Sequence, residues 1–134
     1  MNDGMGEYVA NQVIKLMLKK GIQVLYSNIL ILGFTFKENC PDVRNTKVID
    51  IYNALKEYNL NITIFDPWAD KESVSKEYGI KVCNILPVEK YDAIILAVAH
   101  ETFMSLKMER LFSSETVLYD VKGLLDRKLV DGRL

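Results

Sequence analysis

Two short, almost uninterrupted apolar runs constrain the fold of this chain more than any other feature of its sequence. They occupy residues 28–33 (NILILG) and 93–98 (AIILAV), and both have the length of a strand. Continuous apolar runs of this length are typical of strands that are buried on both faces, as in a parallel sheet covered by helices. The two runs therefore predict the central strands of an α/β domain.

The segments around these runs alternate between helix-like and strand-like patterns. Thr46 can cap a helix in which Val48, Ile51, Tyr52 and Leu55 share one apolar face. Further strands are expected at 62–65, 80–83 and 116–119, and further helices at 70–78 and 102–111. Strands separated by helices imply right-handed crossovers and helices on both faces of the sheet. The predicted fold class is a Rossmann-like, three-layer α/β domain with a mainly parallel sheet.

One extra helix is expected before this domain, over residues 5–20. Met5, Val9, Val13 and Met17 recur at every fourth position, which places them on one helical face. This apolar face is broad for a helix that leads into a domain. Two interpretations stay open: the helix packs on its own domain, or it packs on chain that lies outside this sequence.

Composition restricts the class of protein. The chain has 134 residues, of which 49% are hydrophobic, and its formal net charge is −1. These values fit a folded domain and argue against a dedicated nucleic-acid binder, which needs a basic excess for phosphate contacts. No apolar run approaches the roughly 20 residues of a membrane-spanning helix, and the first residues lack a signal-peptide pattern. Cys40 and Cys83 form no CxxC pair, which excludes a cysteine zinc site. We expect a cytoplasmic domain with no membrane partner and no bound metal.

The loop after the first strand, residues 33–46, is the first candidate for a binding site. Ligands of open parallel sheets bind beyond the carboxyl ends of the strands, and this loop exceeds the roughly 2–6 residues usual in such connections. It contains neither GxGxxG nor GxxxxGK[ST], so neither nucleotide fingerprint is present. It does bring Lys37 and Arg44 toward a helix N-terminus, where anions are favoured. The two cations either bind an anion there or are solvated surface residues.

Four other residues are weaker candidates. Asp66 ends a predicted strand, where it either forms a turn or bonds a ribose hydroxyl. His100 follows the second apolar run and is either a hydrogen-bonded loop histidine or a group that titrates near neutral pH. Lys122 follows the last predicted strand and could join the lysine of the first loop in one basic crevice. Cys40 has no histidine near it in the sequence, so we assign it no nucleophilic role.

The first loop also carries a recognisable pattern. Residues 31–45 (ILGFTFKENCPDVRN) closely resemble a signature of the UDP-glucose/GDP-mannose dehydrogenase family. The similarity continues through residues 66–67 (DP), 97–100 (AVAH) and 119–123 (YDVKG), so it covers nearly the whole chain. It is strongest to the branch that oxidises UDP-N-acetylhexosamines for bacterial surface polysaccharides. The resemblance implies a part in the NAD-dependent oxidation of a UDP-hexose or UDP-N-acetylhexosamine to the uronic acid.

Enzymes of this family have an NAD-binding domain, a central helical domain and a C-terminal domain, and the resemblance assigns this chain to the last. Residues 1–27 resemble the end of the central, dimerising domain, and residues 28–134 resemble the domain that binds the UDP-sugar. The NAD-binding glycines and the segment with the catalytic cysteine are missing. The resemblance implies that this fragment holds no catalytic residue, is inactive alone and belongs to a homodimer when complete. It also implies that helix 5–20 exposes an apolar stripe, because its usual neighbours are missing.

The resemblance further implies roles for four residues. Phe36 and Lys37 match family residues that contact the UDP-sugar, and Arg44 matches an arginine that reaches NAD across the cleft between domains. Lys122 stands where many relatives have an arginine that contacts substrate, and a lysine cannot reproduce the paired hydrogen bonds of a guanidinium. One alternative from another class stays open. In it the chain is a non-catalytic nucleotide-binding or oligomerisation module with a vestigial nucleotide site.

Overall fold

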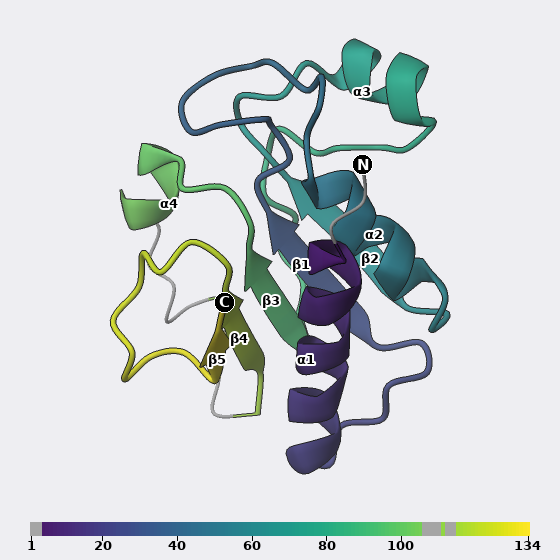
Figure 1. Ribbon diagram of the computed structural model, residues 1–134, viewed down its shortest axis with the longest axis vertical. Helices are drawn as coiled ribbons and strands as arrows, with labels where there is room; N and C mark the ends of the chain where they lie inside the picture. Colours follow the sequence, from purple (N-terminus) through teal and green to yellow (C-terminus); the bar gives the residue numbers. More distant parts are fainter. Residues whose placement is uncertain (1–3, 106–110, 112–114) are drawn as a thin grey trace.

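A computed structural model describes residues 4–105, 111 and 115–134 of the chain. Within that part, the elements in chain order are α1 (Met5–Lys19), β1 (Asn28–Leu32), α2 (Val48–Lys56), β2 (Asn61–Phe65), α3 (Lys71–Tyr78), β3 (Ala93–Leu96), α4 (Glu101–Ser105), β4 (Val117–Asp120) and β5 (Gly132–Arg133). The strands form one sheet in the order β2-β1-β3-β4-β5, and every neighbouring pair is parallel. The predicted Rossmann-like α/β fold is confirmed (Figure 1).

The central strand β1 is covered on both faces. Ile29 and Ile31 lie in the apolar cluster that includes the buried faces of α1 and α2, whereas Leu30 and Leu32 lie in a second cluster with Phe103 of α4. All four strand residues are fully buried. Because successive side chains of a strand point to opposite faces, a strand between two apolar layers needs an apolar residue at every position. This explains the continuous apolar run in the sequence.

Helix α1 belongs to the larger of these two clusters. Val9, Val13 and Met17 are fully buried there, and α1 packs along α2 (Figure 1). A Cβ on Gly6 would lie 2.6 Å from the backbone of Asp50 in α2, so only glycine permits this close approach. The expected exposed stripe is therefore wrong, because α2 and the sheet cover it. The division between residues 1–27 and 28–134 stays a prediction.

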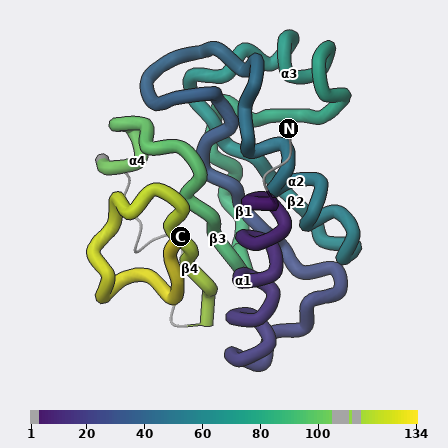
Figure 2. The backbone as a smooth tube through the Cα atoms, viewed as in Figure 1, coloured from purple at the N-terminus to yellow at the C-terminus, as the bar shows by residue number. Residues whose placement is uncertain are grey.

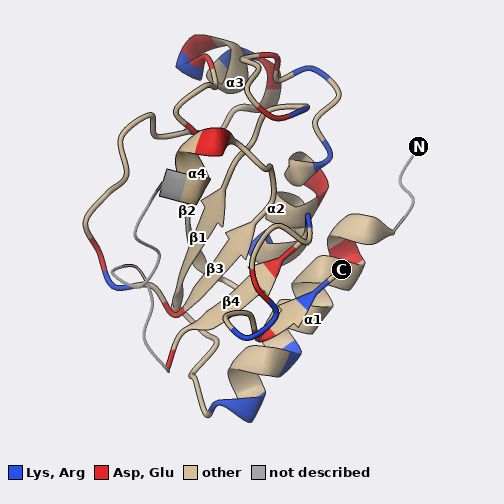
Figure 3. Ribbon diagram, turned by 90° about the vertical axis from the view of Figure 1, so that its left-hand side faces the viewer, with Lys and Arg blue, Asp and Glu red and all other residues tan. Residues whose placement is uncertain are grey.

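The basic end of α1 is tied to the amino-terminal edge of the sheet. Figure 3 shows basic residues, coloured blue, at the C-terminal end of this helix, and all of them are lysines. There the Lys20 ammonium lies 2.9 Å from the Asp131 carboxylate and donates to the Thr116 carbonyl, which precedes β4, over 2.8 Å. This concentration of positive charge lies away from the loops that follow the strands, so charge density alone does not mark a binding site.

The segment 80–83 is not a strand, contrary to the sequence prediction. Phe65 and Cys83 form a single isolated parallel bridge, and Val82 is buried, which accounts for the apolar pattern. The pairing stops at the next residue. There the side-chain amide of Asn84 donates to two carbonyl groups of the loop after β2, over 2.8 and 2.9 Å.

Several element boundaries also differ from expectation. The second apolar run forms a strand only as far as Leu96, because the N–H groups of Ala97 and Val98 both donate to the Leu32 carbonyl, at 2.9 and 3.2 Å. The last predicted strand lies one residue later, as β4, and the two-residue β5 is too short for any periodicity to reveal. Of the predicted helix 102–111, the structure shows α4 as far as Ser105; residues 106–110 lie outside the described residues, and Leu111 lies in a turn. Among the described residues, no helix is long and apolar enough to cross a bilayer.

Candidate functional site

The sheet has its topological switch point between β1 and β3. The chain leaves β1 for β2 on one side and later returns to β3 on the other, and this is where open α/β sheets bind ligands. Gly33 makes the exit from β1 possible. Its φ of +99° is left-handed, and a Cβ there would lie 2.5 Å from the Cβ of Val98. Only glycine fits, so the β1 loop can pass tightly over the loop that follows β3.

A cavity of about 120 Å³ opens at this switch point. The residues that line it come from the β1 loop, the start of α2, the segments after β3 and β4, and the first residue of α1: Thr35, Phe36, Thr46, Lys47, Val48, Ile51, Ala97, Val98, Val121, Lys122 and Met5. Phe36 is 53% exposed, so its ring is available to a ligand. The structure thus brings Phe36 and Lys122, predicted from distant segments, to one cavity.

Helix α2 directs its N-terminal end into this cavity. It begins at Val48, whose N–H donates to the Thr46 hydroxyl over 3.2 Å. The first turn of a helix carries the positive end of the helix dipole, which favours phosphate or carboxylate groups. Lys37 lies on the exposed part of the β1 loop, directly after Phe36 but outside the lining of the cavity. The cavity therefore combines an aromatic ring, a helix N-terminus and nearby cations.

Arg44 lies in a different hollow of about 370 Å³, which it shares with Asp42 and with residues of α3. Its Nε and Nη2 atoms donate to the Asp42 carboxylate at 3.1 and 3.3 Å, and its backbone N–H does so at 2.9 Å. The side-chain hydrogen bond from Arg44 is the main reason that the pKa of Asp42 lies below its usual value. The structure thus separates Arg44 from the cavity that contains Phe36 and Lys122.

The long β1 loop lies beside α3, above the carboxyl ends of the strands (Figure 2). The Tyr78 hydroxyl of α3 donates to the Val43 carbonyl over 2.6 Å, and the Tyr78 ring meets the Phe34 ring edge-on with centroids 5.4 Å apart. Within the loop, the N–H of Phe36 donates to the Asp42 carbonyl over 2.7 Å. These contacts give the loop a defined shape.

Asp66 holds the first part of this loop from beneath. Its Oδ2 accepts the N–H groups of Phe34 (2.6 Å) and Thr35 (3.0 Å), and its Oδ1 accepts those of Trp68 (2.8 Å) and Ala69 (3.1 Å). The carboxylate is fully buried, so it offers no surface to a ribose hydroxyl. The turn interpretation is confirmed and the ribose interpretation is wrong.

The pKa of Asp66 reflects two opposing causes. Burial raises it most strongly, but the hydrogen bonds from His100 and from the Phe34 amide, together with the other groups around it, outweigh burial. The net result is a pKa below the usual value. A buried carboxylate stays ionised only when hydrogen-bond donors surround it, and here they do.

His100 is the second buried group at this edge of the sheet. Its Nε2 lies 2.9 Å from Asp66 Oδ2 and 3.1 Å from Thr35 Oγ1, and its Nδ1 accepts the N–H of Asn39 over 2.8 Å. The ring is completely buried. The prediction of a hydrogen-bonded loop histidine is confirmed. No sequence signal could have linked His100 to Asp66 and Asn39, because the sheet alone brings the three segments together.

Asp120 was not predicted as a site residue. It is buried at the end of β4, where its carboxylate accepts the N–H groups of Lys122, Gly123 and Leu125 at 2.7 to 2.9 Å. It thereby shapes the loop that carries Lys122. An Asp that is followed at short range by Gly after a strand is a recognised turn pattern, so the sequence contained a usable signal. The guanidinium of Arg133 also lies over this loop, since a Cβ on Gly123 would be 2.6 Å from its Nη2.

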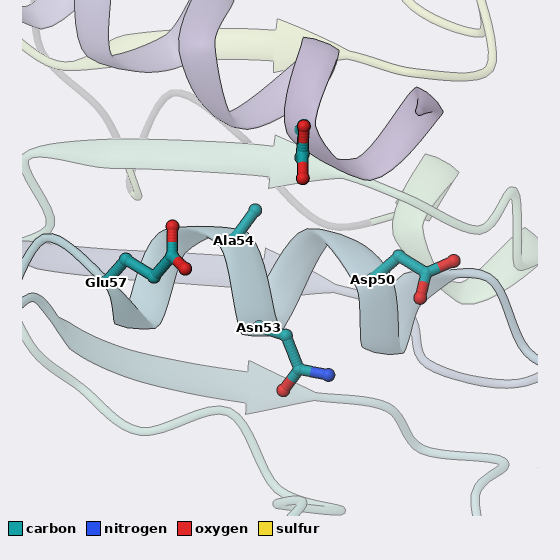
Figure 4. A pocket seen from close by; sticks show the side chains of 5 residues that line it. Asp50, Asn53, Ala54 and Glu57 are labelled. Atoms are coloured by element: carbon teal, nitrogen blue, oxygen red, sulfur yellow. The ribbon is translucent and has the colours of Figure 1, made fainter. Parts of the chain in front are cut away.

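A separate hollow of about 190 Å³ lies between α1 and α2. Its lining includes the carboxylates of Glu7, Asp50 and Glu57, and Figure 4 shows Asp50, Asn53, Ala54 and Glu57 spread along α2. Three carboxylates repel phosphate groups. This hollow is therefore unfavourable for a ligand that carries phosphate groups.

Comparison with known proteins identifies the family. Residues 30–127 match the UDP binding domain of the UDP-glucose/GDP-mannose dehydrogenase family. The match covers most of the chain and includes the β1 loop, the β3 loop and the β4 loop. The chain therefore belongs to the UDP-glucose/GDP-mannose dehydrogenase family, through its UDP binding domain.

Individual relatives agree with this assignment. The chain is 50% identical over 137 residues to a UDP-N-acetyl-D-glucosamine 6-dehydrogenase of Salmonella typhi, with 100% of this chain and 32% of the relative aligned. It is 41% identical over 128 residues to protein CapL of Staphylococcus aureus, with 94% of this chain and 30% of the relative aligned. The chain thus spans about a third of the length of the curated relatives it matches.

Solved structures share the fold. A UDP-D-ManNAc dehydrogenase from Pyrococcus horikoshii superposes with a TM-score of 0.77 at 18% identity, over 98% of this chain and 31% of that one. An NDP-N-acetyl-D-galactosaminuronic acid dehydrogenase from Methanosarcina mazei Go1 gives a TM-score of 0.80 at 21% identity, over 93% of this chain and 26% of that one.

Proposed function

We propose that this chain is the nucleotide-sugar-binding domain of an NAD-dependent UDP-sugar 6-dehydrogenase. The observation that carries the proposal is the switch-point cavity, where the Phe36 ring, Lys122 and the N-terminus of α2 meet. This combination suits a ligand with an aromatic base and a diphosphate. The identity of 50% to a UDP-N-acetyl-D-glucosamine 6-dehydrogenase supports a UDP-N-acetylhexosamine as the substrate, oxidised to its uronic acid for surface polysaccharide synthesis.

Each predicted site residue has a separate task in this proposal. Phe36 packs against the nucleotide sugar, while Lys37 and Lys122 bind its phosphate or sugar oxygens. Lysine acts there as a point charge, so each makes charge-assisted hydrogen bonds without the geometric demand of a guanidinium. Arg44 faces a different hollow, which suits contact with NAD held by the remainder of the complete protein.

The chemistry itself belongs to the complete protein. In this proposal, chain outside the present sequence binds NAD and supplies the catalytic cysteine, and the complete enzyme is a cytoplasmic homodimer. The residues present here bind and orient the substrate. They would hold the UDP moiety so that the sugar carbon to be oxidised reaches the NAD-binding part of the enzyme.

Calorimetric titration of the chain with UDP, and separately with uridine, tests the proposed function. We expect UDP to bind and uridine to bind at least tenfold more weakly, because roughly 1.5–3 kcal/mol of affinity is assigned to charged contacts with the diphosphate. Equal affinities for the two ligands would contradict the assignment of the diphosphate to the α2 N-terminus. Failure of the chain to bind UDP would favour the alternative, a non-catalytic or oligomerisation module.

A further inference from the structure

The exposed part of the β1 loop is held at both ends by one imidazole ring. Before it, the Thr35 hydroxyl lies 3.1 Å from His100 Nε2, and after it, the Asn39 N–H donates to His100 Nδ1 over 2.8 Å. Only residues 36–38 lie between these anchors, and they include Phe36 and Lys37. The ring comes from the segment after β3, on the other side of the switch point. A single side chain from another segment therefore fixes the span of the loop that faces the ligand.

The two ring nitrogens have different and complementary roles. Because the Asn39 N–H points at Nδ1, that nitrogen must be an acceptor, which leaves the proton on Nε2. The Nε2 proton then points at the ionised Asp66 carboxylate, 2.9 Å away, and at the Thr35 oxygen. Thr35 in turn donates its hydroxyl proton to the Lys37 carbonyl over 2.9 Å. Hydrogen bonds thus run without a break from Asp66 through His100 and Thr35 to the backbone of Lys37.

The surroundings of the ring exclude a direct role toward a ligand. His100 is completely buried, with its centroid 5.3 Å from that of Phe103 and 6.2 Å from that of Trp68. Both nitrogens are occupied by hydrogen bonds within the protein. Such a ring cannot touch the substrate, yet it can fix the backbone that presents the residues that do.

We propose that His100 is the positioning residue of the UDP-sugar site, acting with Asp66 and Thr35 to hold residues 36–38 in the geometry that binds the nucleotide. The inference rests on the proposed function for its ligand. Its structural part, the restraint of the loop, can be measured without one. An imidazole serves here because it offers a donor and an acceptor on opposite sides of one rigid ring.

Three variants separate the contributions of the ring. His100→Phe keeps a planar ring and removes the hydrogen bonds of both ring nitrogens, to Asp66, Thr35 and Asn39. His100→Asn places an oxygen near the position of Nδ1, so it can still accept from Asn39. His100→Gln places an amide near the position of Nε2, so it can still donate to Asp66. Thr116→Val is the matched control, because it removes another buried hydrogen bond (Oγ1 to the Tyr91 carbonyl, 3.0 Å) at the opposite edge of the sheet.

Amide hydrogen exchange measures the restraint of the loop directly. We expect exchange at Phe36 and Asn39 to accelerate at least tenfold in His100→Phe and to stay within about twofold of wild type in Thr116→Val. His100→Asn should protect Asn39 better than His100→Gln does, a difference that general destabilisation would not produce. Unchanged exchange at Phe36 and Asn39 in all three His100 variants would overturn the proposal.

UDP affinity measures the consequence for binding. In folded protein, we expect His100→Phe to weaken UDP binding roughly tenfold, a loss of about 1.4 kcal/mol, and Thr116→Val to change it less than about twofold. In a Lys37→Ala background, His100→Phe should cost less than about threefold, because the contact that it positions is already gone. Wild-type affinity in His100→Phe would overturn the positioning role, whereas a wild-type chain that binds no UDP would contradict the proposed function instead.

Discussion

The β1 loop and the β4 loop are held in their conformations by groups from different parts of the fold. Each follows a parallel strand at the carboxyl edge, each carries a candidate lysine, and each is shaped by a buried aspartate that accepts backbone N–H groups. Asp120 belongs to β4 itself, so the β4 loop is held by its own strand. The β1 loop is held by Asp66, after β2, and by His100, after β3. Its support therefore comes from both neighbouring strands.

This difference determines which strands must be in place before each loop can adopt its conformation. In the β4 loop the aspartate acts locally, because Asp120 bonds residues at most five positions away. The β1 loop takes its shape only when β2, β1 and β3 lie in the observed order, because Asp66 and His100 must meet beneath it. The conformation of the proposed substrate loop is thus coupled to the assembly of the central sheet.

The largest expected effect compares the two aspartates. Asp66→Ala removes the partner of four amides and of His100 inside the core, so the free energy of unfolding should fall by about 3–5 kcal/mol. Asp120→Ala leaves three partly buried amides without their acceptor and should cost about 1–3 kcal/mol. Urea unfolding of both variants measures the two losses. Equal losses would contradict the contrast between the loops.

The next effect concerns the lysine of the β1 loop. Lys37→Ala should weaken UDP-sugar binding roughly 10- to 100-fold in the complete protein, since a charge-assisted hydrogen bond contributes about 1.5–3 kcal/mol. Lys90→Ala, on the opposite edge of the sheet, is the matched control. Arg44→Ala should have the opposite effect and weaken the binding of NAD more than the binding of the UDP-sugar. An affinity for the UDP-sugar within about twofold of wild type in Lys37→Ala would mean that this loop does not bind the substrate.

The lysine of the β4 loop should matter less. Lys122→Ala is expected to weaken UDP binding about threefold to fivefold, because ordering a long exposed side chain from a locally held loop offsets part of its electrostatic gain. Lys122→Arg should retain wild-type affinity or improve it, since a guanidinium can form paired hydrogen bonds with phosphate. Calorimetric titration with UDP measures both variants. A larger loss in Lys122→Ala than in Lys37→Ala would reverse the ranking of the two loops.

The smallest effect is the contribution of Asp66 to the pH dependence of stability. Burial raises the pKa of Asp66, but the hydrogen bonds from His100 and the loop amides, with the other groups around it, outweigh burial and leave the pKa below its ordinary value. A lowered pKa in the folded state stabilises the protein above the unfolded pKa and loses that contribution as pH falls through the folded value. The free energy of unfolding should therefore decrease below about pH 4, and this decrease should be shallower in Asp66→Asn. An identical acid slope in Asp66→Asn would show that Asp66 is not the group responsible.

The same contrast explains how much could be predicted from the sequence. The strands β1 and β3 were predictable because they are covered on both faces and so carry continuous apolar runs. Asp120 had a local turn signal that sequence reasoning did not use. The link between Asp66, His100 and Asn39 had no local signal, because it exists only where three segments meet. The sequence also could not show which segments bury α1, because the apolar face of a helix has the same pattern whichever partner covers it.

The central claim is that UDP lies in the switch-point cavity against the β1 loop, and nuclear Overhauser effects between bound UDP and the chain test it most directly. We expect contacts from UDP protons to the ring of Phe36 and to the methyl groups of Val48 and Val98, which line the cavity. In His100→Phe, the same experiment should show a weaker contact between UDP and Phe36, with a smaller change at the two valines. Contacts confined to the hollow between α1 and α2, near Ala54, would contradict the account.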